Sequence, residues 1–187
     1  LMFKEIYDKF PHSHLFLVGS GPELDKLKEL TKTLKLEDHV TITGFVPNDE
    51  LLEYYAAADV TCLWSWVEAQ GLVLLEAMAQ GTPSIGLNAM GIKDVIINGK
   101  TGFLVNDRSE FIEKTVEIFS DDNLRKELSK NSLIEIENHR MENIAKTWVE
   151  AYELMIDIYP MIVARAERPH RSEVIKDFVK HNKYCRY

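Results

Sequence analysis

Two glutamates stand in residues 66–86, WVEAQGLVLLEAMAQGTPSIG, a segment otherwise dominated by apolar and small residues. Glu68 precedes Gly71 and Glu76 follows it, eight positions after the first glutamate. A buried carboxylate is costly unless it is paired or hydrogen-bonded. Two such groups could form an acid/base pair of glycosidase type, or each could accept two hydroxyl hydrogen bonds from a sugar diol. The structural alternatives are a helix-dipole role for Glu76 and a solvated loop for Glu68, and the pattern alone leaves all of these open.

Two other loops place glycine where a strand is expected to lead into the next element. In GSGP, Gly19 and Gly21 would let a phosphate or sugar approach backbone N–H groups at the positive end of a helix dipole. Position 24 is Leu, so the third glycine of a dinucleotide fingerprint is absent and a plain tight turn is the alternative. In NAMGIKDVI, Gly91 permits close backbone approach, and Lys93 either neutralises a phosphate or faces solvent.

The elements that must position these loops alternate along the chain. Short apolar runs indicate strands, and amphipathic stretches indicate helices. Ser20 and Glu23 have capping-box spacing, and Asn48 is a candidate N-cap. Strands are predicted at 14–19, 40–45, 59–64, 82–87 and 102–105, and helices at 20–34, 47–58, 71–80, 109–119, 121–138 and 141–159, with a helical turn at 92–97. This alternation predicts an α/β fold with a doubly wound parallel sheet, Rossmann-like, followed by C-terminal helices.

The two ends of the chain depart from this pattern. Residues 1–14 read as the end of a helix that leads into a strand, whereas a doubly wound domain normally opens on a strand. We therefore expect a domain over 1–162 that lacks its first strand. Residues 165–171, RAERPHR, predict a break before a short basic helix, so 163–187 is expected to be a separate tail.

Composition narrows the function classes. The net charge is −8, and 163–187 contributes +4, so the body is strongly acidic and nucleic acid is not expected as a partner. No apolar run reaches the length needed to span a bilayer, and the first residues do not resemble a signal peptide. Cys62 and Cys185 predict reduced thiols in a cytoplasmic protein, and no cluster indicates a metal site. Cys62 lies in an apolar strand and is expected to be a core residue.

The glutamate segment and its neighbours resemble a known family. E-x7-E within EAQGLVLLEAMAQGTPSIG, preceded by FLVGSGPELDKLKEL and VTITGFVPNDELLEYYAAADV and followed by GIKDVIINGKTGFLV, is similar to retaining glycosyltransferases of family 4. The resemblance covers about residues 1–160 and concerns the C-terminal, donor-binding half of the two-domain GT-B fold. It implies transfer of a hexose from a nucleoside diphosphate sugar, most readily UDP-glucose or another UDP-sugar, with retention of configuration.

The resemblance also implies a role for each matching residue. Glu68 would contact the transferred sugar near the reaction centre, and Glu76 would hold the ribose. Gly71 and Leu72 would present N–H groups to the diphosphate. Further pocket residues would be Gly19 and Gly21 beside the diphosphate, and Val46 and Leu51 near the base. No metal or other cofactor is implied.

Several departures from the family pattern limit what this chain would do alone. The family's basic pair for the diphosphate follows the first strand of this domain, and its acceptor-binding half with a catalytic histidine comes earlier still. Neither has a counterpart here, so the isolated chain is expected to be nearly inactive. Lys93 and Asp94 stand where many relatives have Pro-Glu.

The acceptor and the basic tail leave alternatives open. The EAQG form and the AMGIKDVI loop resemble bacterial members that glucosylate lipids, so the acceptor would be a lipid or a glycan used in glycolipid or polysaccharide synthesis. The tail would then either pack on the N-terminal half or assist peripheral association with the inner face of the membrane. A nucleotide-sugar epimerase or hydrolase of the same fold, or a nucleotide-binding module without turnover, remains the alternative function.

Overall fold

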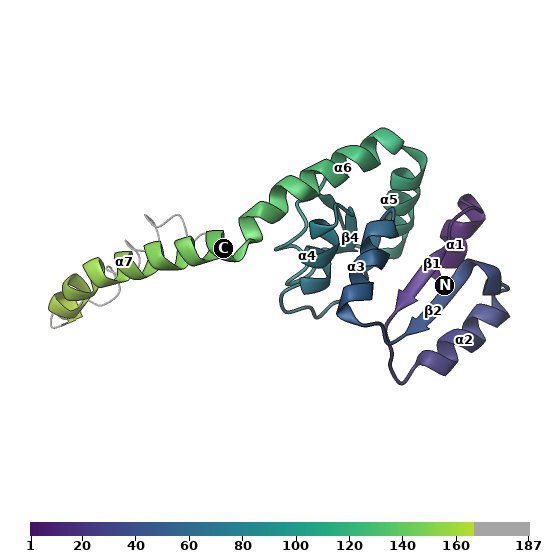
Figure 1. The fold of residues 1–187 in the computed structure, drawn as a ribbon, viewed down its shortest axis with the longest axis horizontal. Coiled ribbons are helices and arrows are strands. Elements are labelled where there is room, and N and C mark those ends of the chain that lie inside the picture. The colour runs from purple at the N-terminus through teal and green to yellow at the C-terminus, as the bar shows by residue number, and fades with distance from the viewer. Residues whose placement is uncertain (167–187) are drawn as a thin grey trace. The chain divides into compact units, whose positions relative to one another are not determined.

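The computed structural model describes residues 1–166, and the chain divides into two compact units, the first ending at Glu137 and the second beginning at Asn138. The first unit holds strands and helices in alternation, and the second is helical (Figure 1). The predictions for the end of the basic tail concern residues beyond Ala166, which lie outside the described part.

The first unit confirms the predicted α/β alternation. Its strands are β1 (Leu15–Val18), β2 (Val40–Gly44), β3 (Thr61–Leu63), β4 (Ser84–Leu87) and β5 (Gly102–Val105). Its helices are α1 (Met2–Lys9), α2 (Leu24–Thr33), α3 (Asn48–Ala57), α4 (Leu72–Ala79), α5 (Arg108–Ser120) and α6 (Asp122–Glu135), with a short 3-10 helix at Glu37–His39. A second 3-10 helix, Ile136–His139, spans the boundary between the two units. The predicted turn at 92–97 is a series of hydrogen-bonded turns.

The strands form two parallel sheets. β1 pairs with β2, and β3, β4 and β5 pair in that order. β1 and β2 appear as adjacent arrows with α2 beside them in Figure 1. α2 connects β1 to β2 and α4 connects β3 to β4, whereas hydrogen-bonded turns lead from β4 to β5. In the described residues, the four outer strands β1, β2, β3 and β5 each have one edge with no strand beside it.

The core covers β4 on both faces. All four residues of β4 are buried, and its side chains enter two apolar clusters. One cluster lies under α1, α5 and α6 and includes Ile6, Phe111 and Leu128. The other packs α4 against the turns after β4 and includes Leu74 and Ile92. A strand covered on both faces is typical of a parallel sheet.

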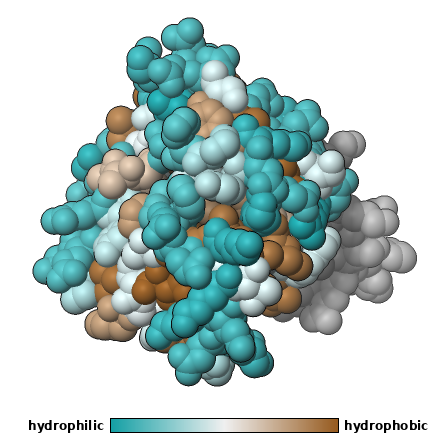
Figure 2. All heavy atoms as spheres, turned by 90° about the vertical axis from the view of Figure 1, so that its right-hand side faces the viewer, coloured by the Kyte–Doolittle hydropathy of each residue, from teal (hydrophilic) through white to brown (hydrophobic). Residues whose placement is uncertain are grey.

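The edge strands β1 and β3 are less buried than β4. Phe16 is 50% exposed and Val18 is 36% exposed in β1, and Cys62 in the middle of β3 is exposed. The expectation that Cys62 is a core residue is therefore wrong for this structure. On the side of the molecule seen in Figure 2, apolar surface shows between hydrophilic side chains.

The helix starts correct two local predictions. Glu23 itself occupies the N-cap of α2, without a side-chain cap, and its carboxylate pairs with Lys26 at 2.9 Å, so the predicted capping box is wrong. Pro47 is the N-cap of α3 and Asn48 is its first residue, because the extended backbone of Pro47 lets the helix begin at the next position. Asp107 and Asp121 provide the side-chain caps, of α5 and α6 respectively.

The second unit contains α7 (Met141–Ala166), a helix of 26 residues. Trp148 and Tyr152 stack with ring centroids 5.9 Å apart, and both side chains are exposed. Apolar residues recur at three- and four-residue spacing, which places them on one helical face. No helix among residues 1–166 is both long enough and apolar enough to cross a membrane.

Candidate nucleotide-sugar site

The loop between β3 and α4 holds the first glutamate against the start of the helix. Gly71 is the N-cap of α4, with a left-handed φ of 63°. The Glu68 carboxylate accepts hydrogen bonds from the N–H of Gly71 at 3.0 Å and of Gln70 at 3.3 Å. These backbone donors lower the pKa of Glu68, with the Gly71 bond as the largest cause. The side chain predicted to meet a sugar therefore folds back onto its own helix N-terminus in this structure.

The N–H groups at the start of α4 are potential hydrogen-bond donors to an anion. The first N–H groups of any helix lack an acceptor within the helix, and the dipole favours negative charge there. The N–H of Gly71 already donates to the Glu68 carboxylate. Leu72 is the next residue, the first of the helix, and it is exposed. A carboxylate on this end shows that the geometry suits an anion.

The third glycine loop packs directly on the first glutamate's loop. Gly91 has φ +82°, and a Cβ on it would lie 2.1 Å from the carbonyl oxygen of Glu68. The N–H of Gly91 donates to Asp94 at 3.3 Å, which fastens the turn. The close approach that Gly91 permits is therefore to protein backbone, and Asp94 has a structural role, while Lys93 is exposed.

The residue after β1 bonds to the end of β2. The N–H of Gly19 donates to the carbonyl of Gly44, the last residue of β2, at 2.9 Å. Gly19 and Gly21 are both exposed, and no atom lies within 4 Å of a Cβ placed on either. Val46 lies in the loop after β2, and the N–H of Leu51 donates to Pro47 in the first turn of α3. The structure thus gathers the predicted residues into two groups, at the carboxyl ends of the two sheets.

The second glutamate joins helices that belong to these two groups. Glu76 lies in α4, and its carboxylate accepts a hydrogen bond from the Tyr55 hydroxyl of α3 at 3.1 Å. Burial, followed by this hydrogen bond and by the charge of Glu76, raises the pKa of Tyr55 to about 12. The Tyr55 backbone is held in turn by the buried Thr82, whose hydroxyl donates to the Tyr55 carbonyl at 2.5 Å.

Sequence reasoning missed Tyr55 and Thr82. Tyr55 lies beside another tyrosine in the helix segment EYYAAA, where helical periodicity assigns a face but gives no partner for a hydroxyl group. The phenol meets Glu76 only because α3 and α4 pack together, 21 residues apart in sequence. No local signal in the chain identifies this pair.

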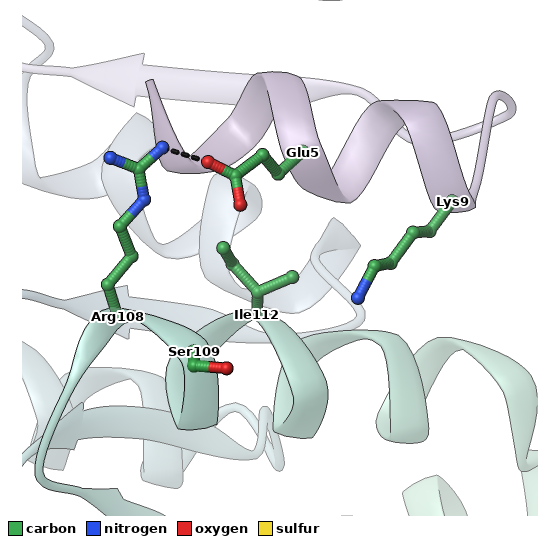
Figure 3. A pocket seen from close by; sticks show the side chains of 5 residues that line it. All are labelled: Glu5, Lys9, Arg108, Ser109 and Ile112. Atoms are coloured by element: carbon green, nitrogen blue, oxygen red, sulfur yellow. Dashed lines mark hydrogen bonds and ion pairs between the residues drawn. The ribbon is translucent and has the colours of Figure 1, made fainter.

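A cavity of about 250 Å³ lies elsewhere, between α1 and α5. Figure 3 shows that Arg108 reaches Glu5 across it, with Ser109 and Ile112 on the side of α5 and Lys9 on the side of α1. None of the residues predicted for the site lines it. The cavity is therefore separate from the predicted site residues at the strand ends. Within residues 1–166, no group of three or more His, Cys, Asp or Glu side chains is arranged to hold a metal ion.

Comparison with known proteins decides the family. The model of the family "Glycosyl transferases group 1" matches residues 1–133. The chain belongs to this family. N-acetyl-alpha-D-glucosaminyl L-malate synthase of Bacillus anthracis is 36% identical over 141 residues, which is 74% of this chain and 36% of that protein. Alpha-monoglucosyldiacylglycerol synthase of Acholeplasma laidlawii is 31% identical over 155 residues, which is 83% of this chain and 39% of that protein.

A solved glycosyltransferase structure agrees with the fold. Sucrose-phosphate synthase from Thermosynechococcus elongatus superposes with a TM-score of 0.72 at 30% sequence identity, over 83% of this chain and 42% of that one. The parallel sheets and flanking helices of the group 1 chain are therefore those of a GT-B glycosyltransferase half. The chain spans about two fifths of the length of these three relatives.

Proposed function

We propose that this chain is the donor-binding half of a retaining, family 4 glycosyltransferase that takes a hexose from a nucleoside diphosphate sugar, most readily UDP-glucose. The observation that carries the proposal is the arrangement at the N-terminus of α4 in a group 1 chain. Glu68 and the Gly71 N–H meet there, and the Gly91 loop closes against them. Glu76 lies in the second turn of the same helix.

The proposed residue roles follow this arrangement. The diphosphate occupies the N–H groups of Gly71 and Leu72, beside Gly19 and Gly21, because an anion is favoured at a helix start. It takes the place that the Glu68 carboxylate holds in this structure. Glu68 is then released to contact the hydroxyls of the sugar that is transferred.

The nucleoside lies on the other side of the diphosphate. Glu76 accepts hydroxyl hydrogen bonds from the ribose, since a carboxylate offers about four acceptor positions and Tyr55 occupies one. The backbone at Val46 recognises the base, with Leu51 nearby, because both follow β2 at the carboxyl end of its sheet. The binding of the diphosphate requires no metal in this scheme.

We further propose that residues 1–162 form the donor-binding domain and that one more parallel strand lies between β1 and β3. Six-stranded doubly wound sheets have the order 3-2-1-4-5-6. The order β2–β1, then β3–β4–β5, matches this series with its first strand left out. The exposed Phe16, Val18 and Cys62 are the residues that such a strand and its neighbours would cover.

The acceptor is proposed to be a lipid or a glycan held by an N-terminal half. The relative from Acholeplasma laidlawii is named for a diacylglycerol glycolipid, which favours a lipid acceptor at the inner face of the membrane. This chain alone would bind the nucleotide sugar and transfer little or nothing.

A nucleotide titration tests the donor assignment. We expect UDP to bind the chain more tightly than GDP or ADP, and Glu76→Ala to weaken UDP binding by about tenfold, as the loss of a hydrogen bond to a charged group does. Glu53→Ala, which removes an exposed carboxylate from α3, is the matched control and should leave the affinity unchanged. Equal affinity of the wild type and Glu76→Ala would refute the ribose assignment.

A second assay identifies the reaction. The chain joined to the N-terminal half of a group 1 transferase is incubated with UDP-glucose and acceptor, and transfer, hydrolysis and epimerisation are measured side by side. Epimerised or hydrolysed donor without transfer would favour the alternative enzyme, and binding without turnover would favour a nucleotide-binding module. If the Glu68→Ala variant transferred the sugar at the full rate, the proposed contact between Glu68 and the transferred sugar would be refuted.

A further inference from the structure

Tyr55 is the one tyrosine of the described residues whose hydroxyl meets a predicted site carboxylate. Its oxygen donates to Glu76 Oε2 at 3.1 Å, from the last turns of α3 to the second turn of α4. Both side chains are partly buried, so the bond is partly screened from water. A hydrogen bond to an ionised acceptor is stronger than a neutral one and fixes the direction of the acceptor.

A buried anchor fixes the tyrosine itself. Thr82 is 3% exposed, and its hydroxyl donates to the carbonyl of Tyr55 at 2.5 Å. The N–H of Thr82 donates to the carbonyl of Ala77, one residue after Glu76, at 2.9 Å. Thr82, Tyr55 and Glu76 thus close a loop of contacts that ties the end of α3 to the body of α4.

We infer that Tyr55 is a positioning residue for nucleotide binding, because its hydroxyl holds one oxygen of Glu76 and leaves the other aimed at the ribose diol. This inference rests on the proposed role of Glu76. A long glutamate side chain has several rotamers, and ordering it on binding costs free energy. A carboxylate that is already oriented avoids that cost, as preorganised sites do.

The contact also has a place in the architecture. α3 follows β2 in one sheet and α4 follows β3 in the other, so the Tyr55–Glu76 bond links the groups of loops that the two sheets present. The base and the ribose of one nucleotide would lie on these two groups. Orientation of Glu76 by a residue of α3 therefore couples the ribose contact to the element nearest the base.

The test compares UDP with 2′-deoxy-UDP by calorimetry on the chain and four variants. We expect Tyr55→Phe to lower UDP affinity about three- to tenfold and to reduce the preference for UDP over 2′-deoxy-UDP. Tyr54→Phe is the matched control, because Tyr54 is the adjacent tyrosine of α3 and packs edge-on to Phe16 instead. It should keep both the affinity and the preference.

The remaining variants separate this inference from the proposed function. Glu76→Ala should abolish the preference for UDP, and Tyr55→Phe combined with Glu76→Ala should match Glu76→Ala alone, because the two residues act through one contact. If Glu76→Ala loses the preference while Tyr55→Phe retains it fully, the positioning role is wrong and the ribose assignment stands. If Glu76→Ala keeps the preference, or if the wild type binds no UDP, the ribose assignment fails and the inference fails with it.

Discussion

The contact between Gly91 and the carbonyl of Glu68 offers a sharp test of how the site is held. In Gly91→Ala, the new Cβ would lie 2.1 Å from the Glu68 oxygen and 2.7 Å from its carbonyl carbon. Both atoms belong to backbone, so no flexible side chain can move aside. Ordinary contact begins at 3.4 Å, so the two loops would have to separate by more than about 1 Å.

The expected cost has two parts. Alanine at the left-handed φ of +82° costs about 1–2 kcal/mol relative to glycine. Displacement of a packed loop adds about 1–3 kcal/mol, the usual cost of overpacking. The alanine also restricts the unfolded chain, which returns about 0.4–1 kcal/mol. We expect Gly91→Ala to lower the free energy of unfolding by about 2–4 kcal/mol overall.

Gly99→Ala is the matched control for backbone strain. Its φ is +74°, but no atom lies within 4 Å of the added Cβ. It should therefore lose only the strain contribution, about 1 kcal/mol. Urea denaturation measures both changes as shifts of the midpoint at constant slope. UDP affinity is measured in parallel and should fall in Gly91→Ala alone.

The comparison of these two variants decides the matter. Equal destabilisation by Gly91→Ala and Gly99→Ala would show that the Gly91 loop does not rest on the Glu68 backbone. Unchanged UDP affinity in a folded Gly91→Ala variant would show that the contact does not position the site. Either result would refute the reasoning that joins these two loops.

Two further predictions concern Glu68 and Cys62. Because backbone N–H groups lower the pKa of Glu68, its stabilising contribution should be present above about pH 4.5 and be lost as pH falls through the lowered pKa. The difference in unfolding free energy between wild type and Glu68→Gln, measured in urea, should therefore shrink in acid. A difference that does not change with pH would contradict this prediction. Desolvation by neighbouring atoms raises the pKa of the Cys62 thiol to about 12, although the residue is exposed in β3. In the variant Cys185→Ser, a thiol reagent should modify Cys62 slowly at neutral pH. The modification should stop when a polypeptide that supplies the proposed strand is added. Undiminished labelling in its presence would argue against a strand between β1 and β3.

Much of the fold could be predicted because the signals are local. All four residues of β4, which lie within the predicted strand 82–87, are buried, and the predicted residues 102–105 coincide with β5. Helix starts were less predictable, since Pro47 and Glu23 rather than Asn48 and Ser20 precede the helices. Capping depends on a few backbone angles, which spacing in the sequence does not specify.

The sequence by itself indicated the parallel α/β class, because side-chain type and periodicity record burial along each element. The order and spacing of its motifs indicated the family, and that resemblance suggested which residues would bind a nucleotide sugar. Only the tertiary structure decided what those residues contact. The packing of α3 on α4 supplies Tyr55 to Glu76, and the turn at Gly91 meets the backbone of Glu68. Both contacts join segments more than 20 residues apart, so their partners depend on how the elements pack and not on any local pattern.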